Sequence, residues 1–128
     1  MSHMYTNEYL NIMINFQLIE GHMKEGIKIR HRQLSMLAKV HGQFKYEPNY
    51  KWLDKFTMGP LAKKFSEYCS DESLLKRIEA SIPTRNLFAH NLIQPIDIES
   101  LTSLHDRPIH VLRADLSNLM DREFYPYR

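Results

Sequence analysis

Three polar side chains, Arg85, Asn86 and His90, lie close together in an otherwise apolar stretch of the sequence. An arginine carries a permanent charge on a planar fork of donors that matches the oxygens of a phosphate. A histidine gains and loses a proton near neutral pH, and an amide can hold a phosphate oxygen, a ribose hydroxyl or the imidazole. Together they suit a phosphate whose neighbours must exchange protons, as in cleavage of RNA through its own 2′-hydroxyl.

A short helix bounded by Pro83 and Pro95 is expected to carry these residues. Proline has the backbone geometry of a first helical turn, so Pro83 is expected near the start, with Ser81 or Thr84 as the cap. Pro95 removes a backbone donor and clashes with the preceding turn, so the helix should end near Ile93.

The run from Arg85 to Asn91 (RNLFAHN) resembles the signature of the HEPN superfamily, an arginine, a polar residue, a short apolar spacer and a histidine. In a helix, Asn86 and His90 lie one turn apart on one face, with Arg85 beside Asn86. The resemblance covers about seven residues of the chain. It implies an all-α, dimeric, metal-independent ribonuclease, and many members belong to bacterial toxin–antitoxin or phage-defence systems.

A catalytic role can be written for each of the three residues. His90 takes or gives a proton, Arg85 stabilises the extra charge on the phosphate oxygens, and Asn86 positions the phosphate, the ribose or the His90 ring. This scheme requires no metal and no cofactor, and its products are a 2′,3′-cyclic phosphate and a 5′-hydroxyl. One protomer supplies one such histidine, whereas the chemistry needs an acid and a base. We therefore expect a homodimer with a shared cleft, as the resemblance also implies, and a partner protein from an antitoxin or defence system.

Other interpretations stay open. The chain could be a non-catalytic HEPN-like module that binds RNA or nucleotide, or a structural or interaction domain in which Arg85 pairs with Glu79 or caps a helix and His90 is a hydrogen-bonded structural group. HEPN toxins that resemble partners of nucleotidyltransferase antitoxins have a tyrosine two residues after the histidine. Leu92 occupies that position here, which puts regulation through such a tyrosine in doubt.

Length and composition favour one soluble domain. The 128 residues suffice for a single core, and Met1–Met4 are interpreted as a cloning scar that precedes a domain over residues 5–128. The single cysteine, Cys69, cannot form an internal disulfide, and no histidine or aspartate partner suggests a thiol nucleophile. No apolar run approaches the roughly 18 residues of a membrane span and no signal peptide is evident, so we expect a cytoplasmic protein without a membrane partner.

Apolar periodicity predicts helices throughout, and therefore an all-α fold, an antiparallel bundle of four to six helices. The expected elements are one long or two stacked helices over 7–40, a loop over 41–50, a short helix at Trp52–Phe56, helices over 60–68 and 72–80, the Arg85 helix, a segment over 96–108 that is irregular or briefly helical around 99–104, and a last helix over 109–124.

The first predicted helix has an apolar stripe at alternating steps of three and four. Its members are Tyr9, Met13, Phe16, Met23, Ile27, Leu34 and Leu37. Glu20 and Arg30 stand where apolar residues are due, and they either extend to the rim of the core or line a polar cleft shared with the Arg85 helix. Gly21 and Gly26 are expected to mark a bend or a close helix–helix approach.

Charge is unevenly distributed, although the net charge is only +2. Residues 24–64 hold ten basic against three acidic side chains, which favours contact with an RNA backbone or forms the solvated faces of ordinary helices. The RNA-binding candidates are Lys24, Lys28, Arg30, Arg32, Lys63 and Lys64. The other histidines show no metal-ligand spacing and are expected at the surface, namely His22, His31, His41, His105 and His110.

Overall fold

A computed structural model describes residues 7–42, 50–89 and 98–127, and within these ranges the chain is an all-α helical bundle without strands. The predicted fold class is therefore confirmed. The elements are α1 (Asn7–His41), the 3-10 helix η1 (Lys51–Lys55), α2 (Met58–Phe65), α3 (Glu72–Ala89), α4 (Ile98–Glu123) and the 3-10 turn η3 (Tyr125–Tyr127). The predictions for the cloning scar, most of the 41–50 loop, His90, Leu92 and the helix end near Ile93 lie outside the described residues.

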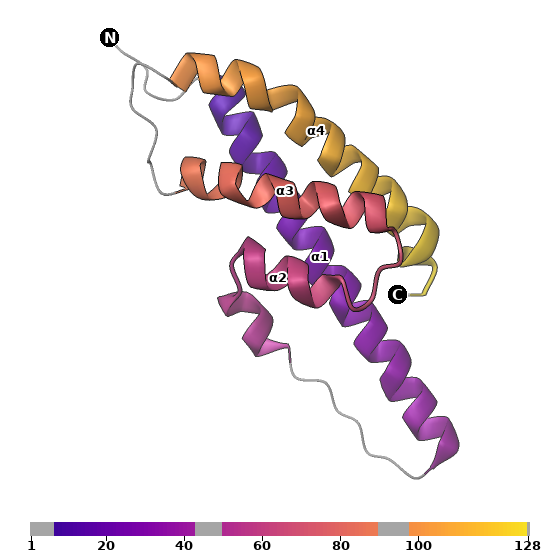
Figure 1. Ribbon diagram of the computed structural model, residues 1–128. Helices are drawn as coiled ribbons and strands as arrows, with labels where there is room; N and C mark the ends of the chain where they lie inside the picture. The colour runs from indigo at the N-terminus through magenta and orange to yellow at the C-terminus, as the bar shows by residue number, and fades with distance from the viewer. Residues whose placement is uncertain (1–6, 43–49, 90–97, 128) are drawn as a thin grey trace.

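The long helix α1 is the axis on which the other helices pack (Figure 1). Helix α4 lies along α1 and runs in the same direction, since Arg113 reaches Asn15 near one end and Tyr125 meets His22 further along. Helices α2 and α3 cross α1 and run antiparallel to each other (Figure 1). The predicted antiparallel arrangement is therefore wrong for the pair α1 and α4, which run parallel. The reason is that α3 carries the chain back to the start of α1 before α4 begins.

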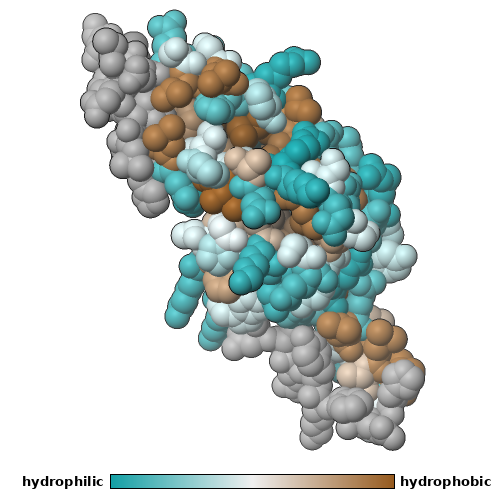
Figure 2. All heavy atoms as spheres, in the orientation of Figure 1, coloured by the Kyte–Doolittle hydropathy of each residue, from teal (hydrophilic) through white to brown (hydrophobic). Residues whose placement is uncertain are grey.

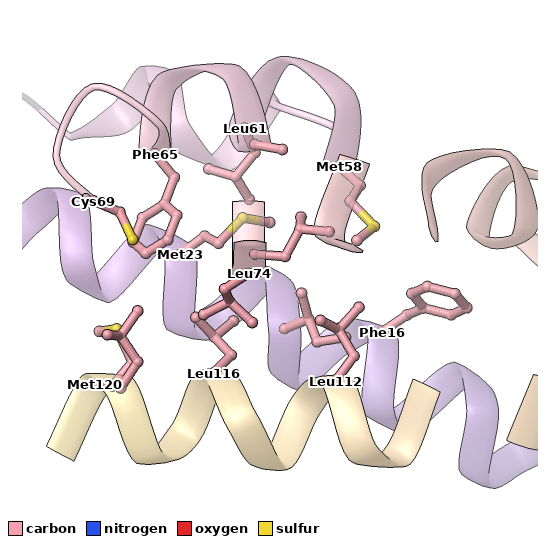
Figure 3. Close-up of a cluster of buried hydrophobic side chains, with 14 of the residues drawn as sticks. Phe16, Met23, Met58, Leu61, Phe65, Cys69, Leu74, Leu112, Leu116 and Met120 are labelled. Carbon is pink, nitrogen blue, oxygen red and sulfur yellow. The ribbon is translucent and has the colours of Figure 1, made fainter. Parts of the chain in front are cut away.

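The core lies where all four helices meet (Figure 3). Phe16 and Met23 of α1, Leu61 and Phe65 of α2 and Leu116 of α4 are each at most 1% exposed. Burial of one such side chain contributes about 1.5–3 kcal/mol relative to an exposed one. The apolar faces of the helices predicted over 60–68 and 109–124 therefore contribute to the core. Tyr68 is half-buried at its margin.

The α1 stripe is buried only along the first two thirds of the helix. Tyr9, Phe16, Met23 and Ile27 are buried as predicted. The prediction was wrong at the end of the stripe, because Leu34 and Leu37 are 46% and 56% exposed. This last part of α1 extends past α2, α3 and α4 (Figure 1), and of the described elements only the turn η3 lies against it, at Met36 and Leu37.

Gly26 marks a close helix–helix approach. A Cβ at this position would stand 2.8 Å from Cε1 of Phe65 and 3.3 Å from Cε of Met120. Gly21, in contrast, has no atom within 4 Å of such a Cβ. Of the two expected roles, a bend or a close helix–helix approach, the structure shows a close approach at Gly26.

Helix α3 is a single helix from Glu72 to Ala89, not two helices separated at Pro83. Asp71 caps its start, because its Oδ1 accepts the backbone N–H of Leu74 at 3.0 Å. Pro83 is exposed, so the carbonyl that loses its helical donor faces water, and the helix continues. Ser81 is not a cap, since it is buried inside the helix and its hydroxyl donates to the Ile78 carbonyl at 2.6 Å.

Helix α4 also continues through a proline. The segment 96–108 was expected to be irregular or briefly helical, but the helix begins at Ile98 and passes through Pro108. Pro108 is exposed, whereas Thr102 on the same helix is buried at 2% exposure. Packing of the buried face thus maintains the helix across a residue that sequence rules treat as a boundary.

The two short helices η1 and α2 lie where they were predicted, with ends shifted by a few residues. Helix α2 begins at Met58, two residues before Pro60, which then lies in the first turn. In η1 the fully buried side chain is Leu53, whereas Trp52 is half-buried against the core.

Candidate active site at Arg85

Arg85 stands in the core-facing stripe of α3. Leu74, Ile78, Ser81 and Phe88 are the buried residues of this helix, and Arg85 falls between the last two at the same alternation of three and four. Its side chain is only 17% exposed. A charged group in such a position requires a partner, because transfer of an unpaired charge out of water is costly.

Glu20 of α1 is that partner. Its Oε1 accepts a hydrogen bond from Nε of Arg85 at 3.0 Å, and the carboxylate side chain is also 17% exposed. Glu20 interrupts the apolar stripe of α1 between Phe16 and Met23, as Arg85 interrupts that of α3. The two positions that the apolar pattern leaves to charged residues thus meet where the helices cross.

The structure decides between two alternatives that the sequence left open. Arg85 pairs with Glu20 of α1 and not with Glu79 of its own helix. The Glu79 side chain is exposed. Arg30 lies elsewhere: its guanidinium stacks on Phe124 at 4.0 Å from the ring centre and donates to the carbonyl of Glu123 at 3.3 Å. Of the two charges in the α1 stripe, Glu20 therefore lines the Arg85 site, and Arg30 packs at the far end of α4.

Asn86 adds an amide beside the guanidinium. Nη1 of Arg85 donates to Oδ1 of Asn86 at 3.5 Å, a long hydrogen bond, while Nε is directed to Glu20. The carboxylate and the amide thereby fix two sides of one planar group. The third predicted residue, His90, lies outside the described residues.

The last turn of α3 is anchored to α1. The hydroxyl of Tyr9 donates to the carbonyl of Phe88 at 2.8 Å, and the two rings lie 5.3 Å apart. This bond ties the backbone at the end of the described part of α3 to the first turn of α1. His105 of α4 packs edge-on against Phe88 from another side, with ring centres 6.2 Å apart. The helix end that precedes His90 is thus held by both neighbours.

The six predicted RNA-binding side chains do not form one patch. Lys24 lies one helical turn after Glu20 on α1, and Lys28 lies one turn further, with its Nζ 5.9 Å from the centre of the Tyr50 ring. Arg32 instead pairs with Glu25 at 3.3 Å, with both side chains at least one third exposed. Arg30 is directed towards α4, as described above.

The two α2 lysines also separate. Lys63 lines a groove of about 440 Å³ between α2 and α3, whose α3 wall includes Ile82. Asn86 lies one helical turn beyond Ile82, so this groove extends towards the Arg85 site. Lys64 pairs with Glu67 at 2.8 Å and lies 5.7 Å from the Trp52 ring centre. Lys24, one turn from Glu20, and Lys63, in the groove that reaches Ile82, are therefore the basic candidates nearest in register to the site, whereas Lys28 lies over Tyr50.

His31 was wrongly expected at the surface. It is 7% exposed, and its Nε2 is 2.7 Å from the hydroxyl of Tyr68. The rings of Tyr50 and Trp52 lie 6.0 and 6.2 Å from it. Burial lowers the pKa of His31, the charge of Lys64 lowers it further, and Glu67 opposes the shift in part. A helical position that looked polar in the sequence thus lies inside an aromatic cluster.

His22 is half-buried rather than exposed, and Nδ1 of its ring is 2.7 Å from the hydroxyl of Tyr125. Burial lowers the pKa of His22, helped by Arg113 and opposed by Asp121. His105 is half-buried as well, and His110 is exposed as expected. The side chain of His41 lies outside what the structure describes. These histidines therefore include two with structural partners that the sequence pattern did not reveal.

Cys69 is a core residue. Its side chain is buried, and burial raises the pKa of the thiol, which keeps it protonated at neutral pH. Over the described ranges, no three His, Cys, Asp or Glu side chains are grouped as a metal site requires. The helices of those ranges also include none that is both long and apolar enough to cross a bilayer.

Comparisons with known proteins leave the geometry as the basis for interpretation. No family model matches the sequence, no curated protein matches it, and no solved structure matches the fold. The chemistry of the Arg85 site therefore has to be argued from its own residues.

Proposed function

We propose that the protein is a metal-independent endoribonuclease of the HEPN type. The observation that carries the proposal is the Arg85 guanidinium, which is largely buried on the core face of α3, held by Glu20 at 3.0 Å and adjacent to Asn86. His90 follows four residues after Asn86 in the sequence. A fixed cation, an amide and a titratable imidazole are the groups that RNA cleavage through the 2′-hydroxyl needs.

The reaction uses one proton acceptor and one proton donor. A base removes the 2′-hydroxyl proton, the 2′-oxygen attacks the phosphorus, and the bond to the 5′-oxygen breaks as that oxygen receives a proton from an acid. His90 performs one of these proton transfers, and His90 of a second copy performs the other. Arg85 stabilises the negative charge on the phosphate oxygens, and Asn86 orients the phosphate or the ribose. The products are a 2′,3′-cyclic phosphate and a 5′-hydroxyl.

The substrate is RNA, and the basic side chains of Lys24, Lys28 and Lys63 attract its backbone. The protein acts as a homodimer with a cleft formed by both copies. Its biological role is that of a toxin or phage-defence effector that is controlled by a partner protein.

Cleavage of a labelled mixed-sequence RNA in EDTA tests the proposal. We expect wild type to leave cyclic-phosphate ends, and Arg85→Ala and His90→Ala to lose at least about 100-fold of the rate, because each removes a group that acts in the transition state. Matched controls are Arg77→Ala, an exposed α3 arginine paired with Asp115, and His110→Ala, an exposed histidine. Both controls should cleave like wild type.

The same experiment separates the alternatives. Equal cleavage by His90→Ala and wild type would exclude the proposed site. RNA binding that requires Arg85, without cleavage, would identify a binding module. Neither binding nor cleavage, with a lower melting temperature for Arg85→Ala, would mean that the pair with Glu20 is purely structural, a role that its partial burial also fits.

A further inference from the structure

Glu20 is the residue of the Arg85 site that no sequence motif includes. It comes from α1, 65 positions away from Arg85, and yet it makes the shortest polar contact of that guanidinium, at 3.0 Å. We propose that Glu20 is a positioning residue of the ribonuclease site, which orients Arg85 and offsets its charge before substrate binds. The inference rests on the proposed function.

The orientation of the guanidinium follows from how Glu20 contacts it. A guanidinium carries five N–H donors, and the carboxylate accepts from Nε, the donor nearest the backbone. Asn86 accepts from Nη1 through a longer bond of 3.5 Å. Within the described part of the chain, donors on both Nη atoms thus stay available for phosphate oxygens. An arginine fixed through Nε loses less side-chain freedom when it binds phosphate through its other edge.

The charge of Glu20 has a second consequence. It cancels that of Arg85 in the resting site, so a phosphodiester with one negative charge is attracted weakly. The phosphorane-like transition state carries additional negative charge on its oxygens, and the attraction of Arg85 for it is correspondingly stronger. The charge of Glu20 lowers the attraction for both states, so the preference for the transition state comes from the fixed orientation of Arg85, which needs no rearrangement as the charge develops.

Steady-state cleavage of one RNA substrate by Glu20→Ala, Glu20→Gln and Glu20→Asp tests the inference. We expect kcat of Glu20→Ala to fall about 10-fold, because the guanidinium loses its orientation, with KM unchanged or lower, because the counter-charge is removed as well. Glu20→Gln keeps an oxygen that accepts from Nε, so its kcat should stay within about 3-fold of wild type, with a lower KM. Glu20→Asp withdraws the carboxylate by one methylene and should lower kcat.

The matched control is Glu25, on the same helix and paired with Arg32 at 3.3 Å. Glu25→Ala should leave kcat and KM unchanged. A merely structural role for Glu20 would change the melting temperature without this separation of kcat from KM. If Glu20→Ala does not fold, the Gln and Asp variants carry the test.

Three outcomes would overturn the positioning role while wild type cleaves RNA: wild-type kcat in Glu20→Ala or Glu20→Asp, a raised KM with unchanged kcat, or a Glu20→Gln variant as impaired as Glu20→Ala. The last result would assign Glu20 to proton transfer. Failure of wild type itself to cleave would instead remove the proposed function, and the positioning role with it.

Discussion

Among single residues outside the Arg85 site, His31 and His22 have the clearest link between burial and pH. His31 is enclosed by Tyr50, Trp52 and Tyr68, and burial lowers its pKa. Burial is also the main reason why the pKa of His22 is lowered. In both cases the neutral imidazole is the form that the folded protein favours, because protonation would place a charge among apolar rings or beside Arg113.

Stability should therefore decrease on acidification. The unfolded chain binds protons at a pKa of about 6.5, whereas the folded chain does so at lower pH. The contribution of the neutral imidazoles is fully present above about pH 6.5 and is lost as pH falls through the interval between the two pKa values. Free energies of unfolding in urea at pH 7.5 and 5.5 measure the loss, and it should be smaller in His31→Gln than in wild type. An equal loss in His31→Gln would assign the dependence to other groups.

Among the secondary-structure elements, the crossing of α1 over α2 and α4 depends on Gly26. The neighbours that a Cβ would meet are the rings of Phe65 and Phe124 and the methyl group of Met120, all in the packed core. Gly21 lies 5 residues earlier on the same helix and faces open space. The same residue type thus has opposite consequences at two positions of one helix.

This contrast gives a paired prediction. Gly26→Ala should destabilise the protein by about 1–2 kcal/mol, because overpacking costs about 1–3 kcal/mol and the gain in helix propensity offsets only part of it. Gly21→Ala gains the propensity without the clash and should stabilise by up to about 1 kcal/mol. Thermal or urea unfolding of both variants measures the difference. Stabilisation by Gly26→Ala would mean that Phe65 and Met120 adjust without cost.

Across the whole molecule, apolar side chains gather in two places on the face seen in Figure 2. One lies over α3 and α4, and the other lies near the end of α1. Exposed residues of α4 include Leu104 at 64%, while those at the end of α1 include Met36 at 66% and Val40 at 79%. Contiguous exposed apolar surface is typical of interaction sites, so each area is a candidate for an interface.

The proposed shared cleft selects between these two areas. Helix α4 packs against the Arg85 end of α3, where Thr84 and Pro108 line one groove, so an interface that includes Leu104 brings two α3 ends together. We expect a dimer in light scattering, weakened at least about 10-fold by Leu104→Arg and unchanged by Met36→Arg. Loss of the dimer in Met36→Arg alone would place the interface at the far end of α1, away from the site.

Local periodicity determined the helices and most of the core. Alternating steps of three and four located the buried faces of α1, α2 and α4 and marked Glu20 and Arg30 as charges in the α1 stripe, while Arg85 stood out as a charge in a short apolar segment. The sequence did not reveal that α3 and α4 continue through Pro83 and Pro108, because the cost of a proline inside a helix is offset here by tertiary packing of the flanking turns.

Only the tertiary structure decided which charges meet. Glu20 and Arg30 were equivalent in the sequence, since both interrupt the same stripe, and the crossing angle of α3 on α1 selected Glu20. The same holds for the six basic candidates and for His31, whose burial depends on η1 and α2 rather than on its own helix. Side-chain type and spacing define a face of one helix, whereas pairing between helices depends on how the core fixes their relative positions.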